Sequence, residues 1–344
     1  MKTYLQKELD ACLDRRDFLK IMGILGISLA TPPAFATPLR EVKFNKKLHK
    51  IERTLPLMGT MVTITVLDPS PNRAEEAVER GFARIKELSQ IFDRFKSNTI
   101  VGVLNAHGYI NDIPPELGYV LKKSLYYYRL TQGAFDVTVK PLVDLLKNSF
   151  ARTGKPPTHQ EIKEALSLVG ANKIFFDGKV VRLKDGMGLT FDGIAKGYIV
   201  DKTAELIKKI GVKHALINAG GDIRAIGKRN WKIAIRNPFN LESYVDMIVL
   251  NDNAIATSGN YEIYFDQEKL YGHIVDPTTG LSPRLNSSTS VIAETVADAD
   301  ALSTTAFVFR PLQAKRFMEA IGKQALIITR QGIKVATKNW PSLA

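Results

Sequence analysis

Cysteine is almost absent from this sequence of 344 residues: the only one is Cys12, near the N-terminus. We expect the segment that contains it to be an export signal, whose removal would leave no thiol, no disulfide and no cysteine-ligated metal. The five histidines are scattered without the spacing of zinc ligands. A chain of this length needs no covalent cross-link, because it can bury one large core or two closely packed subdomains.

Several common phosphate-binding and catalytic motifs are also missing. No G-x-G-x-x-G follows an expected strand and no G-K-[ST] occurs, which argues against a Rossmann fingerprint and a P-loop. The stretch ATSGNY at 256–261 is not G-x-S-x-G, so it does not indicate a nucleophile elbow.

Acidic residues are too few to balance the basic ones. The chain has 48 Lys and Arg against 35 Asp and Glu, a formal net charge of +13. A basic surface suits anionic ligands or a membrane-associated partner. Apart from a minor basic stretch over residues 43–50, Lys and Arg are not clustered among aromatics, and export argues against nucleic acid as a partner.

The N-terminal residues have the pattern of an export signal. Paired arginines open the segment Arg15–Lys20, a short glycine-interrupted apolar run covers Ile21–Ala30, and Ala34–Ala36 has the small-x-small form of a signal-peptidase site. The run is too short for a spanning helix. The segment resembles a bacterial twin-arginine leader, although Asp14 stands where serine or threonine is usual. An ordinary Sec signal and an uncleaved anchor are the alternatives.

We therefore predict a signal peptide over residues 1–36, a basic tether over 37–53 and one domain over 54–344. The mature protein is expected in the periplasm, with no transmembrane span in the mature chain. Association with the membrane surface is left open.

The remaining chain alternates between strand-like and helix-like segments without a regular repeat. A strand is expected over about 57–67, and amphipathic helices begin near Pro71, Pro115 and Thr158. A further helix should end at about Ile210. This order predicts an α+β fold with mixed β-sheets flanked by helices, as a single domain with two intimate subdomains. A solenoid or a barrel of eight repeats is not expected.

Charged residues surround two glycines in LTFDGIAKGYIVDK, residues 189–202. Asp192 and Lys196 are four apart and can meet on one face of a helix. One interpretation is a helix start with Asp192 as N-cap and Lys196 as its surface partner. The other is an anion site, in which N–H groups at the helix start and Lys196 face a phosphate.

A second polar stretch, VADADALSTTA at 296–306, is followed by an apolar helix end. Asp300 and Thr304 lie one helical turn apart and can share a face. A carboxylate beside a hydroxyl is an all-oxygen pair that suits a hard cation such as Mg²⁺, and Ser303 could contribute. The alternative is a helix N-terminus whose acids are favoured by the helix dipole.

Two further segments are candidates for binding or catalysis. Gly220 and Gly221 precede Asp222 directly after a strand, as either a nest of N–H groups or a plain glycine turn. HIVDPTTG at 273–280 is expected to form a strand and a turn. Its His273 could act as a general base for a hydroxyl, although a structural histidine is the commoner outcome.

Taken in order, these segments resemble the ApbE family, the FAD:protein FMN transferases. The resemblance runs from about residue 57 to 309, through LMGT, VGVLN, GAFDVTVKPL, DGIAKGYIVD, NAGGDI, WKIAIRNP, ATSGNY, HIVDPTTG and ADALSTTAF. It implies an ApbE-like (T-fold-like) fold and Mg²⁺-dependent cleavage of the FAD pyrophosphate. FMN would pass to a Thr or Ser hydroxyl of a target flavoprotein, with release of AMP.

The resemblance also implies roles for individual residues. Asp300 and Thr304, with Ser303 and a backbone carbonyl near Gly193, would hold the metal, and Lys196 would face the diphosphate. His273 is the candidate for deprotonating the acceptor. The positions expected to contact FAD are Met58, Phe95, Ala134, Phe135, Asp136, Thr190, Asp192, Lys196 and His273.

The chain departs from the family pattern at one place. The family commonly has Asp-Leu-Gly-Gly before Ile-Ala-Lys-Gly, whereas here the residues are Thr190, Phe191, Asp192 and Gly193. If this segment is a strand end, the shift of two places keeps the carboxylate on the same face. Phe95, where a tyrosine is often found, should preserve ring stacking.

Three functions remain open at this stage. The leading one is the transferase, acting on a membrane-bound respiratory subunit. The second is an FAD pyrophosphatase that uses water as the acceptor. The third is an exported, non-catalytic flavin-binding or carrier protein, which would have no obvious need of a metal pair on one helix face.

Overall fold

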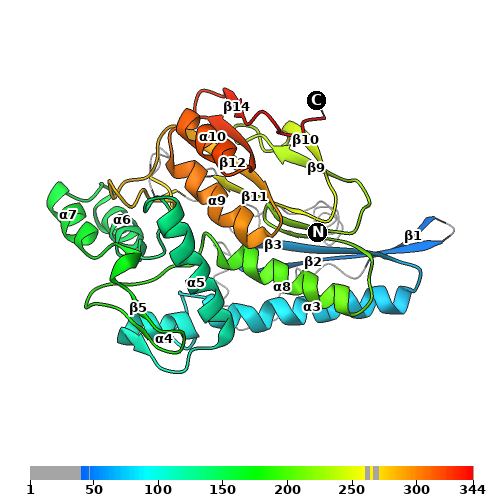
Figure 1. Cartoon of the computed structure of the whole chain (residues 1–344), viewed down its shortest axis with the longest axis horizontal. Coiled ribbons are helices and arrows are strands. Elements are labelled where there is room, and N and C mark those ends of the chain that lie inside the picture. Colours follow the sequence, from blue (N-terminus) through cyan, green and yellow to red (C-terminus); the bar gives the residue numbers. More distant parts are fainter. Residues whose placement is uncertain (1–39, 46, 260–263, 266–270, 344) are drawn as a thin grey trace, which may run out of the picture.

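A computed structural model describes residues 40–45, 47–259, 264–265 and 271–343 (Figure 1). Its centre is a nine-stranded sheet in the order β1-β2-β3-β7-β8-β11-β12-β13-β14. The strands are β1 (Arg40–Asn45), β2 (Leu48–Leu57), β3 (Thr60–Asp68), β7 (His214–Ala219), β8 (Asp222–Ile226), β11 (Ala254–Gly259), β12 (Asn286–Ala293), β13 (Gln324–Thr329) and β14 (Lys334–Ala336).

Helices cover the sheet, and two smaller sheets accompany it. The helices are α3 (Pro71–Phe92), α4 (Ile100–His107), α5 (Pro115–Leu130), α6 (Lys140–Thr153), α7 (His159–Ser167), α8 (Ala195–Lys209), α9 (Val296–Val308) and α10 (Pro311–Ala320), with a short 3₁₀ turn η1 (Ala171–Lys173). The small sheets join β9 (Trp231–Arg236) with β10 (Tyr244–Leu250), and β4 (Tyr109–Ile110) and β5 (Phe175–Phe176) with β6 (Val181–Arg182).

The α+β class predicted from the sequence is confirmed. Sheets are flanked by helices, but every strand pairing among the described residues is antiparallel, so the sheets that we expected to be mixed are antiparallel. None of the helices in the described part of the chain is both long and apolar enough to cross a bilayer.

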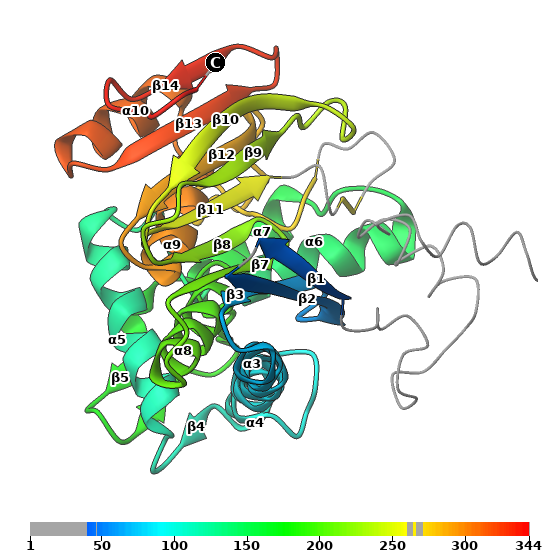
Figure 2. The same cartoon turned by 90° about the vertical axis from the view of Figure 1, so that its right-hand side faces the viewer.

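The main core lies between the sheet and the helix pair α3 and α8 (Figure 2). Alternate residues of β3, Val62, Ile64 and Val66, are buried on this face, as the period of two in a strand requires. The helix α3 approaches closely because Gly81 has no side chain: a Cβ there would lie 2.9 Å from Cδ1 of Ile64.

Helices α4 to α7 and the β4–β6–β5 sheet lie together beside the main sheet (Figure 1). The helix α5 is joined to the start of α9 through Asp298, which pairs with Lys123 at 2.8 Å and accepts a hydrogen bond from the Tyr127 hydroxyl. These contacts bring the loop after α5 to the region where α8 and α9 begin.

Helices α8 and α9 are in close contact at Gly197. A Cβ built on Gly197 would lie 2.5 Å from the carbonyl oxygen of Val296 and 2.8 Å from Cα of Ala297. Backbone atoms cannot move aside as a flexible side chain can, so the two helices reach this distance only with glycine at position 197.

Two of the predictions about local structure are wrong. The tether is wrong from residue 40 onward, because β1 and residues 48–53 of β2 belong to the main sheet. The strand expected over about 57–67 is confirmed as β3, which begins at Thr60 after a turn at Met58 and Gly59 that joins it to β2. The segment 273–280 contains the expected turn but no strand. The predicted signal peptide lies outside the described residues.

We predict that Gly197→Ala destabilises the protein by about 1–3 kcal/mol, the usual cost of forcing extra volume into a packed contact. The measurement is the free energy of unfolding in urea. Gly118→Ala in α5 is the control: its Cβ would lie an ordinary 3.5 Å from Ile113, and alanine favours helix, so stability should hold or rise. An equal loss of unfolding free energy in both variants would contradict the close contact assigned to α8 and α9 at Gly197.

Candidate functional site

Carboxylates link the two helices on both sides of Gly197. Asp201 of α8 accepts hydrogen bonds of 2.9 Å from the backbone N–H groups of Val296 and Ala297. It thereby supplies partners for N–H groups in the first turn of α9, which have none within their own helix. In return, Asp300 of α9 accepts a hydrogen bond of 3.2 Å from the N–H of Gly197.

Two buried carboxylates lie close together at this junction. Asp222, at the start of β8, is 1% exposed and Asp300 is 4% exposed. Lys196 pairs with Asp222 at 2.8 Å. Burial and the neighbouring charge of Asp222 raise the pKa of Asp300 well above its usual range, against the influence of Lys196. A further cation would therefore stabilise the ionised form of this pair.

Hydroxyl groups surround the same point. Ser258 Oγ at the end of β11 lies 2.7 Å from Ser303 Oγ and 3.3 Å from Thr304 Oγ1. Ser303 donates to the carbonyl oxygen of Asp300 at 3.0 Å. A Cβ built on Gly193 would lie 2.9 Å from Thr304 Oγ1. The structure thus brings together the four residues expected at the metal; that they bind one remains a prediction.

The chemistry of this group fits magnesium. Its atoms are carboxylate, hydroxyl and main-chain oxygens, the ligands that hard divalent cations prefer. Within the described residues, no three Asp, Glu, His or Cys side chains gather as a ready metal cage. Water and phosphate oxygens would have to complete the coordination, as is common for magnesium.

The loop after α5 forms one side of the site. Phe135 is buried, and its ring lies 3.4 Å from a Cβ built on Gly193. Thr190, also buried, donates its N–H to the carbonyl of Val137 at 2.8 Å. Ala134 precedes Phe135 in the same loop. These predicted FAD-contacting residues therefore lie beside the predicted metal site.

Asp136 in this loop is turned inward. Its Oδ1 accepts hydrogen bonds from the N–H and hydroxyl of Thr138, at 2.8 and 2.6 Å, and its Oδ2 accepts from the N–H of Ala171 at 3.2 Å. Burial raises its pKa. The carboxylate shapes the loop here, which is a role that the sequence does not predict.

Asp192 is paired with Arg94 rather than capping α8. Its Oδ2 lies 2.9 Å from Arg94 Nε, while the N-cap of α8 is Ile194, which has no side-chain hydrogen bond. The guanidinium of Arg94 also lies 4.3 Å from the ring centre of Phe95, which is 70% exposed. The N-cap interpretation is wrong, and so is the expected pairing of Asp192 with Lys196.

Met58 and His273 are less closely tied to this group. Met58 has a left-handed backbone, with φ 54°, in the β2–β3 turn. That turn lies beside the Gly220 turn, since a Cβ on Gly220 would be 2.2 Å from Thr60 Oγ1. His273 is half-buried in the segment between β11 and β12. The contacts described above do not include it, so its catalytic role stays a prediction.

Sequence reasoning missed three residues at this site. Asp222 and Ser258 lie in segments that were singled out for their glycines and small residues. A carboxylate directly after two glycines at a strand end was the available signal for Asp222. Arg94 gave no local signal, because its partner Asp192 is 98 positions away in the sequence.

Comparison with known proteins agrees with this arrangement. The profile of the ApbE family matches residues 58–328. The chain belongs to the ApbE family. It is 29% identical over 338 residues to the FAD:protein FMN transferase of Haemophilus influenzae, covering 93% of this chain and 95% of that protein. The FAD:protein FMN transferase of Escherichia coli K12 is 27% identical over 316 residues, covering 86% and 89%.

Solved structures of ApbE proteins share the fold. The ApbE protein of Thermotoga maritima is 30% identical, with a TM-score of 0.77, over 84% of this chain and 97% of that one. The flavin transferase ApbE of Vibrio cholerae is 26% identical, with a TM-score of 0.74, over 88% and 99%.

The acid Asp201 predicts a pH dependence of stability. Burial raises its pKa to about 6, against about 3.9 in an unfolded chain. The folded state therefore holds this proton more tightly, and stability due to Asp201 falls as pH rises from about 4 to about 6. Asp201→Asn should remove that decline, measured as the pH profile of the unfolding free energy relative to wild type.

Asp177→Asn is the control for this titration. Hydrogen bonds from the N–H groups of Val180 and Lys179 lower the pKa of Asp177, so its removal should not produce the same difference between pH 4 and 6. A wild-type profile that is parallel to that of Asp201→Asn would show that Asp201 has no raised pKa.

Proposed function

We propose that this chain is an FAD:protein FMN transferase that acts with Mg²⁺. It would cut the pyrophosphate of FAD, attach FMN to a Thr or Ser hydroxyl of a target flavoprotein and release AMP. Membership of the ApbE family supports the enzyme class. The observation that carries the metal dependence is the buried pair Asp222 and Asp300 with the hydroxyls of Ser258, Ser303 and Thr304 around it.

We propose a separate task in this reaction for each residue of the candidate site. Asp300 and Thr304, with Ser303 and the carbonyl of Gly193, would hold the metal, which when bound neutralises negative charge on phosphate oxygens. Lys196, held by Asp222 at 2.8 Å, is a cation available to a diphosphate at the start of α8.

The transfer step exchanges one phosphorus–oxygen bond for another. The acceptor hydroxyl oxygen bonds to the phosphorus of the FMN half, and the bond from that phosphorus to the bridging oxygen breaks. AMP leaves with that oxygen, and the hydroxyl proton passes to a base. We propose His273 as that base, since a histidine can accept a proton near neutral pH.

The site of action is also part of the proposal. The twin-arginine-like leader over residues 1–36 supports export to the periplasm, and the formal net charge of +13 supports docking to an acidic or membrane-bound partner. We propose a membrane-bound respiratory subunit as the acceptor. FAD hydrolysis with water as acceptor is the second candidate, favoured if FMN and AMP appear without a protein substrate.

We predict that Asp300→Asn abolishes Mg²⁺-dependent transfer while the fold stays intact. Asparagine keeps an acceptor for the N–H of Gly197 and removes a charge that Asp222 repels, so stability without metal should hold or rise. Mass spectrometry of the acceptor after incubation with FAD and Mg²⁺ measures transfer. The rise of the melting temperature on adding Mg²⁺ gives a readout independent of activity.

Asp185→Asn, a change of an exposed acid outside the site, is the matched control and should keep both the transfer and the Mg²⁺ shift. Full transfer by Asp300→Asn would overturn the metal assignment. If FAD stays intact after incubation of the wild-type protein with Mg²⁺ and acceptor, the result would instead favour a non-catalytic flavin-binding or carrier protein.

We predict that His273→Gln slows transfer at least tenfold, because a general base typically contributes 10²–10⁴ in rate, and leaves FAD affinity unchanged. Quenched single-turnover assays measure the rate of transfer, and flavin fluorescence measures the affinity for FAD. His159→Gln, an exposed histidine at the start of α7, should alter neither. An unchanged rate in His273→Gln would remove it from the mechanism.

A further inference from the structure

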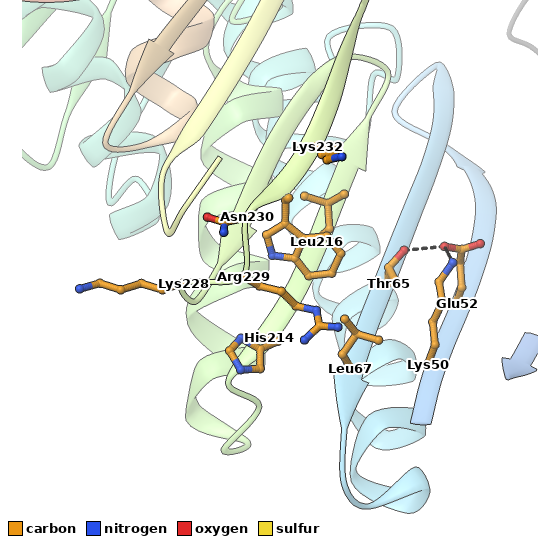
Figure 3. Close-up of a pocket in the computed structure, with 11 residues that line it drawn as sticks. Lys50, Glu52, Thr65, Leu67, His214, Leu216, Lys228, Arg229, Asn230 and Lys232 are labelled. Carbon is orange, nitrogen blue, oxygen red and sulfur yellow. Dashed lines mark hydrogen bonds and ion pairs between the residues drawn. The ribbon is translucent and has the colours of Figure 1, made fainter. Parts of the chain in front are cut away.

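A second, basic hollow lies at the other end of β3 and β7 from the Met58 turn (Figure 3). The strand register builds its floor. One row of neighbouring residues across β2, β3 and β7 consists of Lys50, Leu67 and His214. A second row, two residues further along the strands, consists of Glu52, Thr65 and Leu216. Because side chains alternate along a strand, both rows lie on the face opposite α3 and α8.

The turn from β8 to β9 forms the wall of this hollow. Trp231 begins β9, packs against the second core cluster and directs its Nε1 at the carbonyl of Ile226, 3.5 Å away. With Leu67 and Leu216 it gives the hollow an apolar surface. The open volume is about 700 Å³, within the range of ligand-binding pockets, roughly 300–1,000 Å³.

Positive charge surrounds this apolar surface. Four basic residues line the hollow, against the single carboxylate of Glu52: Lys50, Lys228, Arg229 and Lys232. Glu52 is held by Lys50 at 2.9 Å and by the Thr65 hydroxyl at 2.7 Å. Among the described residues, Lys232 pairs with no carboxylate. An anion that enters would therefore meet Lys232, whose charge it could balance.

His214 lies beside the basic residues of the hollow. Burial lowers its pKa, and the charges of Arg229 and Lys213 lower it further, with Asp68 acting in the opposite direction. The neutral ring is consistent with a positive environment, and an anion bound beside it would raise its pKa.

We propose that this hollow binds an acidic polypeptide segment with an apolar side chain, belonging to a partner protein. Charge and apolar contact are the two features that it offers. Polar groups that could bind a nucleobase already have partners within the protein: Asn230 Oδ1 accepts a hydrogen bond from Asn251, and the Thr65 hydroxyl donates one to Glu52. This disfavours a nucleotide as the ligand. The concave floor disfavours a flat lipid surface, since Lys50 and Arg229 lie inside it.

The identity of the partner rests on the proposed function. A flavin transferase must bind a protein substrate, and a docking site at the far end of β3 and β7 would hold the acceptor without competing for the flavin site. Peptide binding itself does not require that the chain be a transferase, so the two proposals can fail separately.

The test is calorimetric titration with a short synthetic peptide in which glutamates flank one leucine, using the full mature chain at low salt. We expect binding that weakens as salt is added and a raised pKa of His214, followed by NMR. Arg229→Gln with Lys232→Gln should weaken binding at least tenfold. Lys232→Gln alone serves if the double variant does not fold, and should weaken it severalfold.

Lys163→Gln with Lys184→Gln is the matched control. It removes the same charge at two exposed positions that do not line the hollow; peptide affinity should be unchanged. Equal binding of an all-glutamate peptide, of AMP, or of anionic phospholipid vesicles through the same residues would overturn the proposal. So would equal loss in the control.

If the chain transfers FMN, the Arg229 and Lys232 variant should also show a raised KM for its acceptor protein at unchanged kcat. Unchanged peptide binding by that variant would show that the hollow is not the peptide-binding site. Normal peptide binding together with no FMN transfer by the wild-type protein would reject the proposed function alone.

Discussion

The contact between the beginnings of α8 and α9 determines where every other part of the candidate site lies. Gly197 permits backbone-to-backbone packing, and Asp201 and Asp300 each accept N–H groups of the opposite helix. A carboxylate that binds two main-chain N–H groups fixes both the position and the rotation of the helix that it caps. The axis of α9 is therefore set relative to α8, and Lys196 and Thr304 are brought to the same side of the junction.

This contact has an electrostatic cost, which the rest of the fold must offset. Placing Asp300 next to buried Asp222 puts two acids in a region with one close ammonium, Lys196. Buried like charges destabilise a folded protein, and a structural helix junction would be more stable with an amide in place of one of them. Local rules of stability are commonly broken at functional sites, and the large core between the sheet and α3 supplies the stability that permits it.

Local signals predicted the helices well and the long-range contacts poorly. The capping box of Thr158 and Glu161 marks the start of α7 as expected, because both partners are close in sequence. Residues 48–53 of β2 were taken for a tether, since Ile51 is the only one of them that is buried and the charged residues beside it hide the alternation. Sequence order predicted the metal-site group through family resemblance, but Asp222 reaches that group only through the register of β7 and β8.

The departure at Asp192 is explained by the same kind of long-range contact. Residues 190 and 191 are irregular and a turn covers residues 192–194, so this segment is not a strand end. The carboxylate of Asp192 is half-exposed and pairs with Arg94. An unpaired Asp192 would add negative charge beside a site proposed to receive a diphosphate. Arg94, whose side chain is 7% exposed and whose guanidinium lies over Phe95, balances that charge locally. The pair of Asp192 and Arg94 therefore joins the segment of Phe95 to the turn before α8, and leaves Lys196 as the cation proposed to face the diphosphate.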